Sequence, residues 1–251
     1  MIYGIKDCAN LTITSKKDGN PFLHTDYANV ATNEWTSERV YANAKGTRSI
    51  GWDYDKQSTL TLETELFDLK FLAMLAGSAI ETGEADILKR EIVQVNAGKT
   101  ATLKAVPVTG SVAVIAVGTD LLEHIGEPLE EVVSAPTGAQ YSVTGSEVAF
   151  ATDAVEGTVY AVYYVTKVAD AKKLTFSADK FPEMFEITAD ALIRERETGR
   201  DDFVQIQYHK AQPQGNFTIT MSATEPTNLS ITFDLYPNAE KAIADYTIVA
   251  G

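Results

Sequence analysis

The sequence is poor in the residues that build disulfides and metal sites. Its 251 residues include a single cysteine, Cys8, and three histidines, His24, His124 and His209. A single cysteine excludes an intrachain disulfide and a cysteine-based metal cage. The histidines lack the spacing of zinc ligands. We therefore expect no metal and no cofactor, and a chain that needs no oxidising compartment.

Long apolar runs and secretion signals are also missing. The longest apolar stretch, Leu66 to Ala76, is shorter than the roughly 18 to 20 residues that cross a bilayer, and it contains Asp68 and Lys70. Residues Met1 to Asp7 show no basic region followed by an apolar core, so we expect no signal peptide. The sequence predicts no contact with a membrane.

Catalytic motifs are absent as well. There is no phosphate-binding loop, dinucleotide-binding glycine pattern, nucleophile elbow or paired-histidine zinc motif. The densest carboxylate cluster surrounds the turn at Gly199, where Arg194, Arg196 and Arg200 are interleaved with the acids. Mixed charge of this kind favours a solvated or salt-bridged hairpin tip. We expect that the protein is not an enzyme.

Positive charge is scarce. The chain has 35 Asp and Glu against 21 Lys and Arg, a formal net charge of −14. Binding of nucleic acid through its phosphates needs clustered Lys and Arg, so this function is disfavoured. An acidic surface nevertheless suits a conduit that DNA passes without sticking, although many proteins are acidic only for solubility.

Strict alternation of apolar and polar residues is the main pattern present. In the last such stretch Leu229, Ile231 and Phe233 alternate with Ser230 and Thr232. This period predicts strands with one buried and one polar face. Strands of this kind are expected at 10–14, 59–63, 187–194, 204–209, 216–222 and 229–235. Turn-forming residues between them favour antiparallel hairpins.

Helical spacing occurs in two places. From Leu66 to Ala76 the apolar residues fall on a wide stripe, and Gly77 follows where helices commonly end. We expect this helix to pack against a sheet. A second, sparser helical pattern covers Asn238 to Tyr246.

The middle of the chain has a different texture. Residues 91–167 are rich in Val, Ala, Gly and Thr, with short strand patterns and closely spaced turns, which fits a small β-sandwich. We predict a core domain of residues 1–90 and 168–251, with an Ig-like β domain at 91–167 inserted between its halves. In the alternative arrangement the middle strands extend the same sheet.

Two tryptophans, Trp35 and Trp52, flank a polar stretch from Thr36 to Ser49. In an isolated subunit we expect this stretch to be a mobile loop. A long loop in a compact domain usually has a function. We predict an assembly loop anchored by the tryptophans, with Arg39 and Arg48 meeting carboxylates of a neighbouring copy.

Several segments together resemble the bacteriophage tail tube (major tail) proteins. They are 33–36 through 51–54, the strand leading into 65–73, and the stretches 203–209, 215–221 and 229–237. The resemblance implies an antiparallel β-sandwich or split barrel with one packing helix, and no catalysis. The middle segment resembles the Ig-like additions of virion proteins.

The resemblance also implies an assembly. Tail tube subunits form hexameric rings whose strands line an inner β-barrel, and the rings stack through extended loops into a tube for DNA. It implies a location in the virion tail after synthesis in the host bacterial cytoplasm. The implied partners are further copies of the chain, the sheath, baseplate, terminator and tape-measure proteins, and passing DNA without specific binding.

Other functions stay open from sequence. The protein could instead be a capsid decoration or tail terminator protein. A tube subunit would polymerise into filaments, whereas a decoration protein would stay small until offered a capsid. A carbohydrate-binding module would use exposed aromatic side chains, and glycan binding by the 91–167 segment would favour it.

Overall fold

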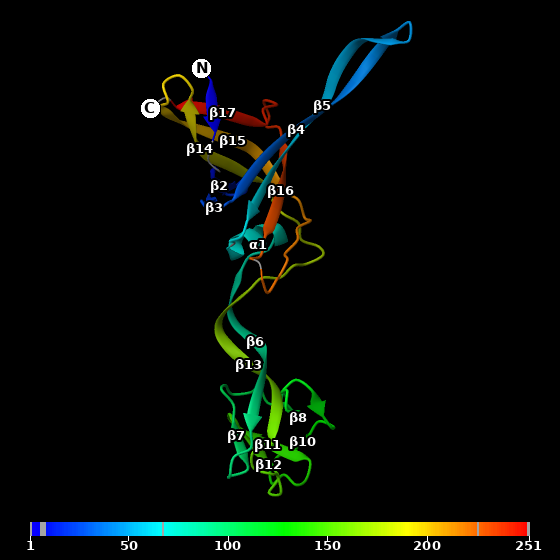
Figure 1. Cartoon of the computed structure of the whole chain (residues 1–251), viewed down its shortest axis with the longest axis vertical. Helices are drawn as coiled ribbons and strands as arrows, with labels where there is room; N and C mark the ends of the chain where they lie inside the picture. The colour runs from blue at the N-terminus through cyan, green and yellow to red at the C-terminus, as the bar shows by residue number, and fades with distance from the viewer. Residues whose placement is uncertain (1, 6–8, 67, 225, 250–251) are drawn as a thin grey trace. The chain divides into compact units, whose positions relative to one another are not determined.

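The computed structural model describes residues 2–5, 9–66, 68–224 and 226–249. It divides into two compact units, Met1–Ile80 with Leu174–Gly251, and Glu81–Lys173. The fold is mainly β, with antiparallel sheets consistent with a β-sandwich, which confirms the predicted fold class (Figure 1). That residues 91–167 form an inserted Ig-like domain stays a prediction.

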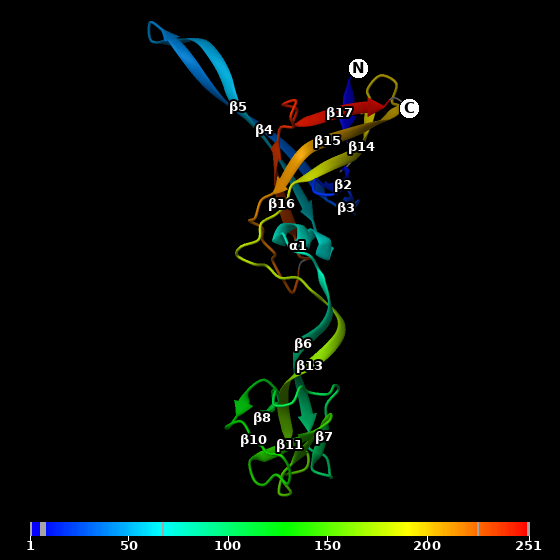
Figure 2. The same ribbon diagram turned by 180° about the vertical axis from the view of Figure 1, so that it is seen from behind.

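The first unit is built on a nine-stranded sheet. Its strands are β1 (Tyr3–Ile5), β2 (Asn10–Ser15), β3 (Pro21–Thr25), β4 (Val30–Ala44), β5 (Thr47–Thr64), β14 (Phe185–Glu195), β15 (Asp201–Pro213), β16 (Leu229–Tyr236) and β17 (Ala244–Val249). The order is β3-β2-β14-β15-β16-β5-β4, with β1 beside β14 and β17 beside β15 (Figures 1 and 2). All these pairings are antiparallel.

Alternation along the strands produces the core of this sheet. In β16 the side chains of Leu229, Ile231, Phe233 and Leu235 are buried, while the residues between them are exposed or half-buried. The same period holds in β2 and β14 and at the carboxyl end of β5. Each buried Leu, Ile or Phe stabilises the fold by about 1.5–3 kcal/mol.

The predicted packing helix is confirmed as α1 (Leu69–Ala76). The expected start at Leu66 is wrong, because the Asp68 side chain accepts the backbone N–H of Lys70 and caps the helix there. Phe67 lies outside the described residues. Phe71, Met74 and Leu75 pack into the core, which ties the helix to the sheet.

Gly77 ends the helix in the left-handed conformation, with φ of 58°. A Cβ at this position would lie 2.2 Å from the carbonyl oxygen of Phe181. The helix end and the 181 segment therefore approach so closely that only glycine fits.

Two predicted elements are wrong. Residues 216–222 form no strand; they make a single bridge between Ile219 and Leu229, and the Met221 side chain is exposed. Residues 238–246 form no helix, because the Asn238 side chain accepts the backbone N–H groups of Glu240 and Ala242, both at 2.9 Å. Such side-chain bonds favour a turn over a helix, and β17 begins at Ala244.

The second unit contains two four-stranded sheets of its own. Their orders are β6-β13-β8-β9 and β10-β11-β12-β7. The bounds are β6 (Glu81–Gln94), β7 (Thr100–Thr102), β8 (Ala113–Val117), β9 (His124–Ile125), β10 (Glu130–Glu131), β11 (Gln140–Thr144), β12 (Glu147–Phe150) and β13 (Val159–Lys173). A separate core includes Val114, Val148 and Val162. The buried Tyr141 hydroxyl donates to the Val112 carbonyl at 2.7 Å.

Candidate assembly surface

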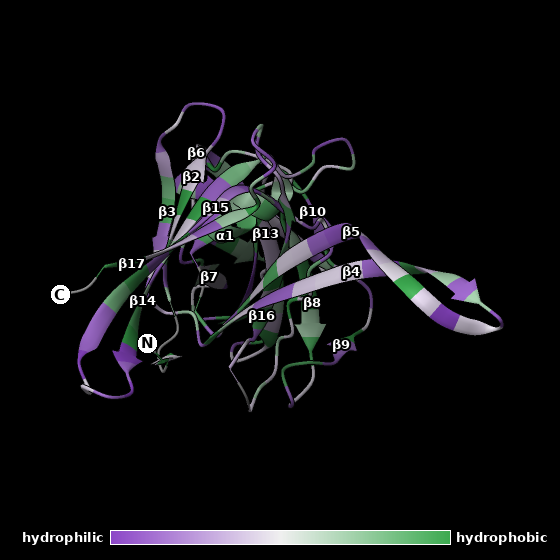
Figure 3. Cartoon of the chain, turned by 90° about the horizontal axis from the view of Figure 1, so that it is seen from above, coloured by the Kyte–Doolittle hydropathy of each residue, from purple (hydrophilic) through white to green (hydrophobic). Residues whose placement is uncertain are grey.

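Strands β4 and β5 continue beyond the sheet as a two-stranded arm, defined here as residues 36–57 (Figures 1 and 3). Every residue of the arm is exposed except Ala42, which is half-buried. The expectation of a loop from Thr36 to Ser49 is therefore wrong, since these residues form a β-hairpin.

The arm closes through a two-residue turn. Lys45 and Gly46 both have positive φ, 51° and 85°, and the flanking residues Ala44 and Thr47 are paired. Positive φ at both central positions is the geometry of the type I′ hairpin turn, which matches the twist of the strands it joins. The Lys-Gly turn between alternating residues is the sequence signal of this hairpin.

Trp35 lies at the base of the arm. Its indole Nε1 donates to Asn33 Oδ1 at 2.7 Å, and the Tyr246 hydroxyl donates to the same oxygen at 3.1 Å. The Asn33 amide donates to Ser58 Oγ, at 2.9 Å. Lys56 Nζ lies 5.0 Å from the centre of the Trp35 ring. Asn33, which accepts the Trp35 hydrogen bond, thus ties the base of the arm to β5 and β17, whereas Trp52 lies out along the arm.

One face of the arm is polar and internally satisfied. Arg39 and Asp53 form a two-pronged ion pair, with Nη2 and Oδ2 at 2.9 Å. This pairing raises the pKa of the Arg39 guanidinium and lowers the pKa of the Asp53 carboxyl. Arg48 stacks 4.2 Å over the Tyr41 ring. Both predicted assembly arginines therefore find partners inside their own arm.

The other face of the arm is apolar and uncovered. Paired residues share a face, and the pairs here are Val40 with Trp52, Ala42 with Ile50, and Glu38 with Tyr54. The Val40, Ile50, Trp52 and Tyr54 side chains are 52–55% exposed. We call Val40, Ala42, Ile50, Trp52 and Tyr54 the apolar face of the arm; Glu38, paired with Tyr54, borders it on the side of the sheet.

The sheet of the first unit has a broad polar face on the side opposite its core. It is formed by Asn10, Thr12, Thr14, Glu186, Thr188, Asp190, Gln205, Gln207, Asp245 and Thr247. Side chains on this face are hydrogen-bonded to one another: Gln205 donates to Asp190 at 3.1 Å and Gln207 donates to Glu186 at 2.8 Å. We call this surface the polar sheet face.

Glu186 is the most constrained acid on this face. Burial by itself would raise the pKa of its carboxyl, but hydrogen bonds from Lys16 and Gln207 outweigh that effect and lower the pKa. The Lys16 ammonium lies 2.8 Å from Glu186 Oε2. The acid therefore stays ionised at neutral pH.

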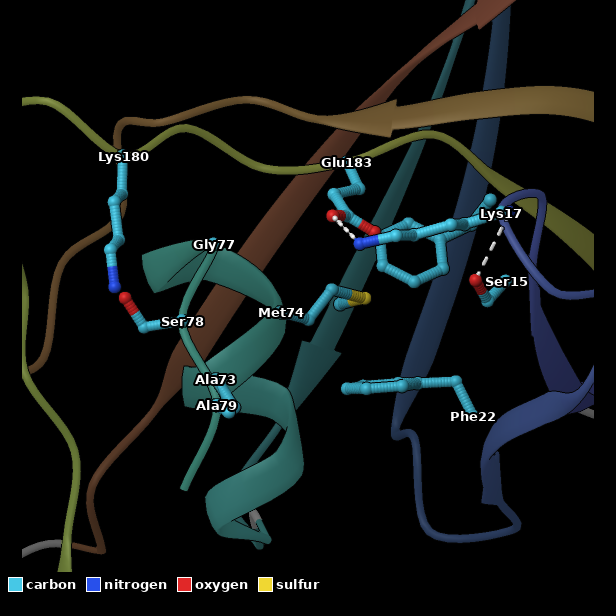
Figure 4. A pocket seen from close by; sticks show the side chains of 11 residues that line it. Ser15, Lys17, Phe22, Ala73, Met74, Gly77, Ser78, Ala79, Lys180 and Glu183 are labelled. Atoms are coloured by element: carbon cyan, nitrogen blue, oxygen red, sulfur yellow. Dashed lines mark hydrogen bonds and ion pairs between the residues drawn. The ribbon is translucent and has the colours of Figure 1, made fainter. Parts of the chain in front are cut away.

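A cavity of about 340 Å³ lies between α1 and the turn after β2 (Figure 4). Phe22, Met74 and Phe185 supply apolar walls, and Lys17 and Glu183 face each other at its rim at 3.5 Å. The cavity can receive a small apolar group. Lys17 and Glu183 are paired with each other, and Lys180 also lines the cavity.

Metal-binding clusters of three or more His, Cys, Asp or Glu do not occur among the residues that the structure describes. Over the same residues, α1 is far too short to span a bilayer. The predicted residues Trp35, Arg39, Arg48 and Trp52 all fall on β4 and β5, where they divide between the base of the arm and its two faces.

A model of the YomU/Tube protein family matches residues 3–249, which include both units. The chain is also 24% identical over 221 residues to a protein named "Tail tube protein" from Bacillus phage SPR. The matched region covers 86% of this chain and 77% of the phage protein. The resemblance to tail tube proteins is thereby confirmed. The chain belongs to the YomU/Tube protein family.

Proposed function

We propose that this protein is a structural subunit of a phage tail tube and has no enzymatic activity. Subunits assemble into hexameric rings, and the rings stack into a tube through which DNA passes. The observation that carries the proposal is the arm, a hairpin of 22 residues from 36 to 57 that is folded yet has no core beneath it. An arm of this kind gains its packing from a neighbouring copy.

Open sheet edges supply the contacts for ring closure. In the described part of the chain β4 pairs with β5 alone, and β17 pairs with β15 alone, so each leaves one edge unpaired. Unpaired edges pair readily with another chain, and a closed ring removes them. Pairing of these edges between subunits makes the sheets continuous around the tube.

The polar sheet face is the surface we assign to the lumen. Its hydroxyl, amide and carboxylate groups hold water, and the hydrogen bonds among them reduce their capacity to bind a ligand. The net charge of −14 repels phosphate. DNA therefore slides past this surface without specific binding.

Membership of the tube family supports the remaining assignments. We place the protein in the virion tail after synthesis in the host bacterial cytoplasm. Its partners are other copies of itself and the sheath, baseplate, terminator and tape-measure proteins of the tail. Residues 91–167 act as an inserted Ig-like domain, supported by the separate sheets and core of the second unit.

Light scattering and negative-stain microscopy of the purified full chain test the proposal. We expect rings and tubes that grow with protein concentration. A strictly monomeric protein at high concentration contradicts a tube subunit. Isolated rings that never stack, or particles that form only when a capsid is added, favour a terminator or a decoration protein.

A further inference from the structure

The apolar face of the arm lies on the side of the ribbon opposite the subunit core. Near the sheet, the core side of β5 carries Leu62, Leu60 and Ser58, which are 2%, 2% and 4% exposed. Ser58 pairs with Trp35, so Trp35 belongs to this side. Farther out, Trp52 and Ile50 occupy the same alternate positions in the sequence as Leu60 and Leu62. In an unbroken strand they would therefore face the core side as well.

A β-bulge prevents this. Between the pairs Thr36–Gln57 and Glu38–Tyr54, strand β4 advances by two residues and β5 by three. The extra residue in β5 moves the side chains between the bulge and the tip of the arm to the opposite face of the strand. Asp55, inside the bulge, has a φ of 51°, a backbone state that is unusual for a residue other than glycine.

Two contacts agree with this inversion. Lys56 lies over the Trp35 ring, which places it still on the core side of the ribbon. Beyond the bulge, a Cβ at Gly51 would lie 3.3 Å from the Tyr41 ring, so Gly51 and Tyr41 share a face. Tyr41 lies an even number of residues from Trp35 along β4, so the polar row of the arm continues the core side. The apolar face, on the opposite side, is continuous with the polar surface of the sheet.

The subunit's own core is therefore on the wrong side to cover the apolar face. None of the four Lys and Arg of the arm belongs to this face, since Arg39 and Arg48 lie in the polar row, Lys56 lies over Trp35 on the core side, and Lys45 lies in the turn. A phosphate-bearing partner would find no Lys or Arg side chain to bind on this face. The face suits an apolar protein surface.

The charge of the arm points to a second copy of this chain. The arm contains four Lys and Arg (Arg39, Lys45, Arg48, Lys56) and three Asp and Glu (Glu38, Asp53, Asp55), a net charge of +1. The rest of the chain has 17 against 32, a net charge of −15. An arm of slight positive charge approaches such a body without the repulsion that two bodies would feel.

We propose that the apolar face of the arm docks on a second copy of this chain, and that the bulge at Asp55–Lys56 sets which side of the arm is buried in that contact. The inference rests on the proposed tube function. The polar row, already satisfied within the arm, remains at the rim of the contact. Val40, Ile50 and Trp52 form its centre, where truncation costs most.

The test compares substitutions on the two faces. Ile50→Thr with Trp52→Thr removes apolar area while keeping strand-forming residues; Arg39→Gln with Asp53→Asn removes the ion pair from the other face without changing net charge. We expect the first variant to raise the critical concentration for assembly by about tenfold or more. The second should raise it less than about threefold.

A pair of variants tests the bulge itself. Inserting one alanine between Ser37 and Glu38 lengthens β4 opposite the bulge, so that both strands alternate regularly and the apolar row turns to the core side. Deleting Lys56 also removes the bulge, but the shortened β5 keeps the apolar row on its present side. We expect the insertion to abolish assembly with the circular dichroism of the subunit retained, and the deletion of Lys56 to assemble. Equal assembly by both variants overturns the role of the bulge.

The outcomes separate this inference from the tube function. Wild-type tubes that are indifferent to the apolar-face variant overturn the inference and leave the function standing. Wild-type oligomers that need the apolar face but never lengthen into tubes overturn the function and leave the inference standing. A strictly monomeric wild type overturns both.

Discussion

The two ends of β5 share the same alternating pattern, but the apolar side chains are buried at one end and exposed at the other. From Leu60 to Thr64 the strand lies in the main sheet. Its alternate side chains are buried in the core, together with side chains of α1 and of neighbouring strands. From Thr47 to Gln57 it pairs with β4 alone, and all of its side chains are exposed. Alternation therefore specifies the strand, while the surface that packs on its apolar face comes either from the same subunit or from a partner.

The largest expected difference is between side-chain truncations at the two ends of β5. Leu62→Ala, at a site that is 2% exposed, should lower the free energy of unfolding by about 2–5 kcal/mol because it leaves a cavity. Trp52→Ala should change it by less than about 0.5 kcal/mol because no cover is lost in the subunit. Urea denaturation of the unassembled protein measures both. Similar losses would show that the arm packs on its own subunit.

Two glycines sharpen the same contrast. Gly77 and Gly46 both have positive φ, 58° and 85°, but only Gly77 is closely approached by another segment. Gly77→Ala should cost about 1–3 kcal/mol from backbone strain, plus the clash with Phe181. Gly46→Ala should leave the thermal melting of the subunit nearly unchanged, since the arm has no part in the core. A larger loss at Gly46 would contradict an energetically independent arm.

The second unit offers a third comparison. Replacing Glu81–Lys173 with a short Gly-Ser linker should leave the first unit folded, because the strands on the two sides of this division belong to different sheets. The expected melting temperature of the remainder is within a few degrees of that of the parent chain. An insoluble product would show that the middle strands are needed by the main sheet.

The smallest effect concerns pH on the polar sheet face. The pKa of Glu186 in the folded state is lowered from its ordinary value of 4.5, so its contribution to stability is complete above that pH and is lost as pH falls through the folded pKa. Glu186→Gln should therefore lose less than about 1 kcal/mol at pH 7 and melt like the parent in strong acid. An undiminished acid sensitivity of the variant would contradict this assignment.

The sequence predicts the covered part of the molecule well. The strands around Leu11, Ile187, Val204 and Leu229 each show a buried face that alternation alone identifies. The helix is recognised from its apolar stripe and from Gly77, though its start is set by the cap at Asp68. These features are local, so they can be predicted from local patterns.

Features that depend on partners or on single backbone states are predicted less well. The stretch 216–222 alternates like a strand but finds only one bridge, and the Asn238 side chain diverts a helical pattern into a turn. The arm was predicted as a loop because its polar residues imply no core, although Lys45-Gly46 is a hairpin turn. The bulge at Asp55 has no evident sequence signature, so the face that assembles could not be read from the sequence.

Removal of the arm tests the central claim most directly. A short Gly-Ser turn in place of residues 36–57 leaves the remainder of β4 and β5 paired in the sheet. Negative-stain microscopy of this variant beside the wild type, at matched concentration, should show tubes for the wild type and folded subunits without long tubes for the variant. Tubes of normal length from the variant would contradict the claim that the arm builds the tube.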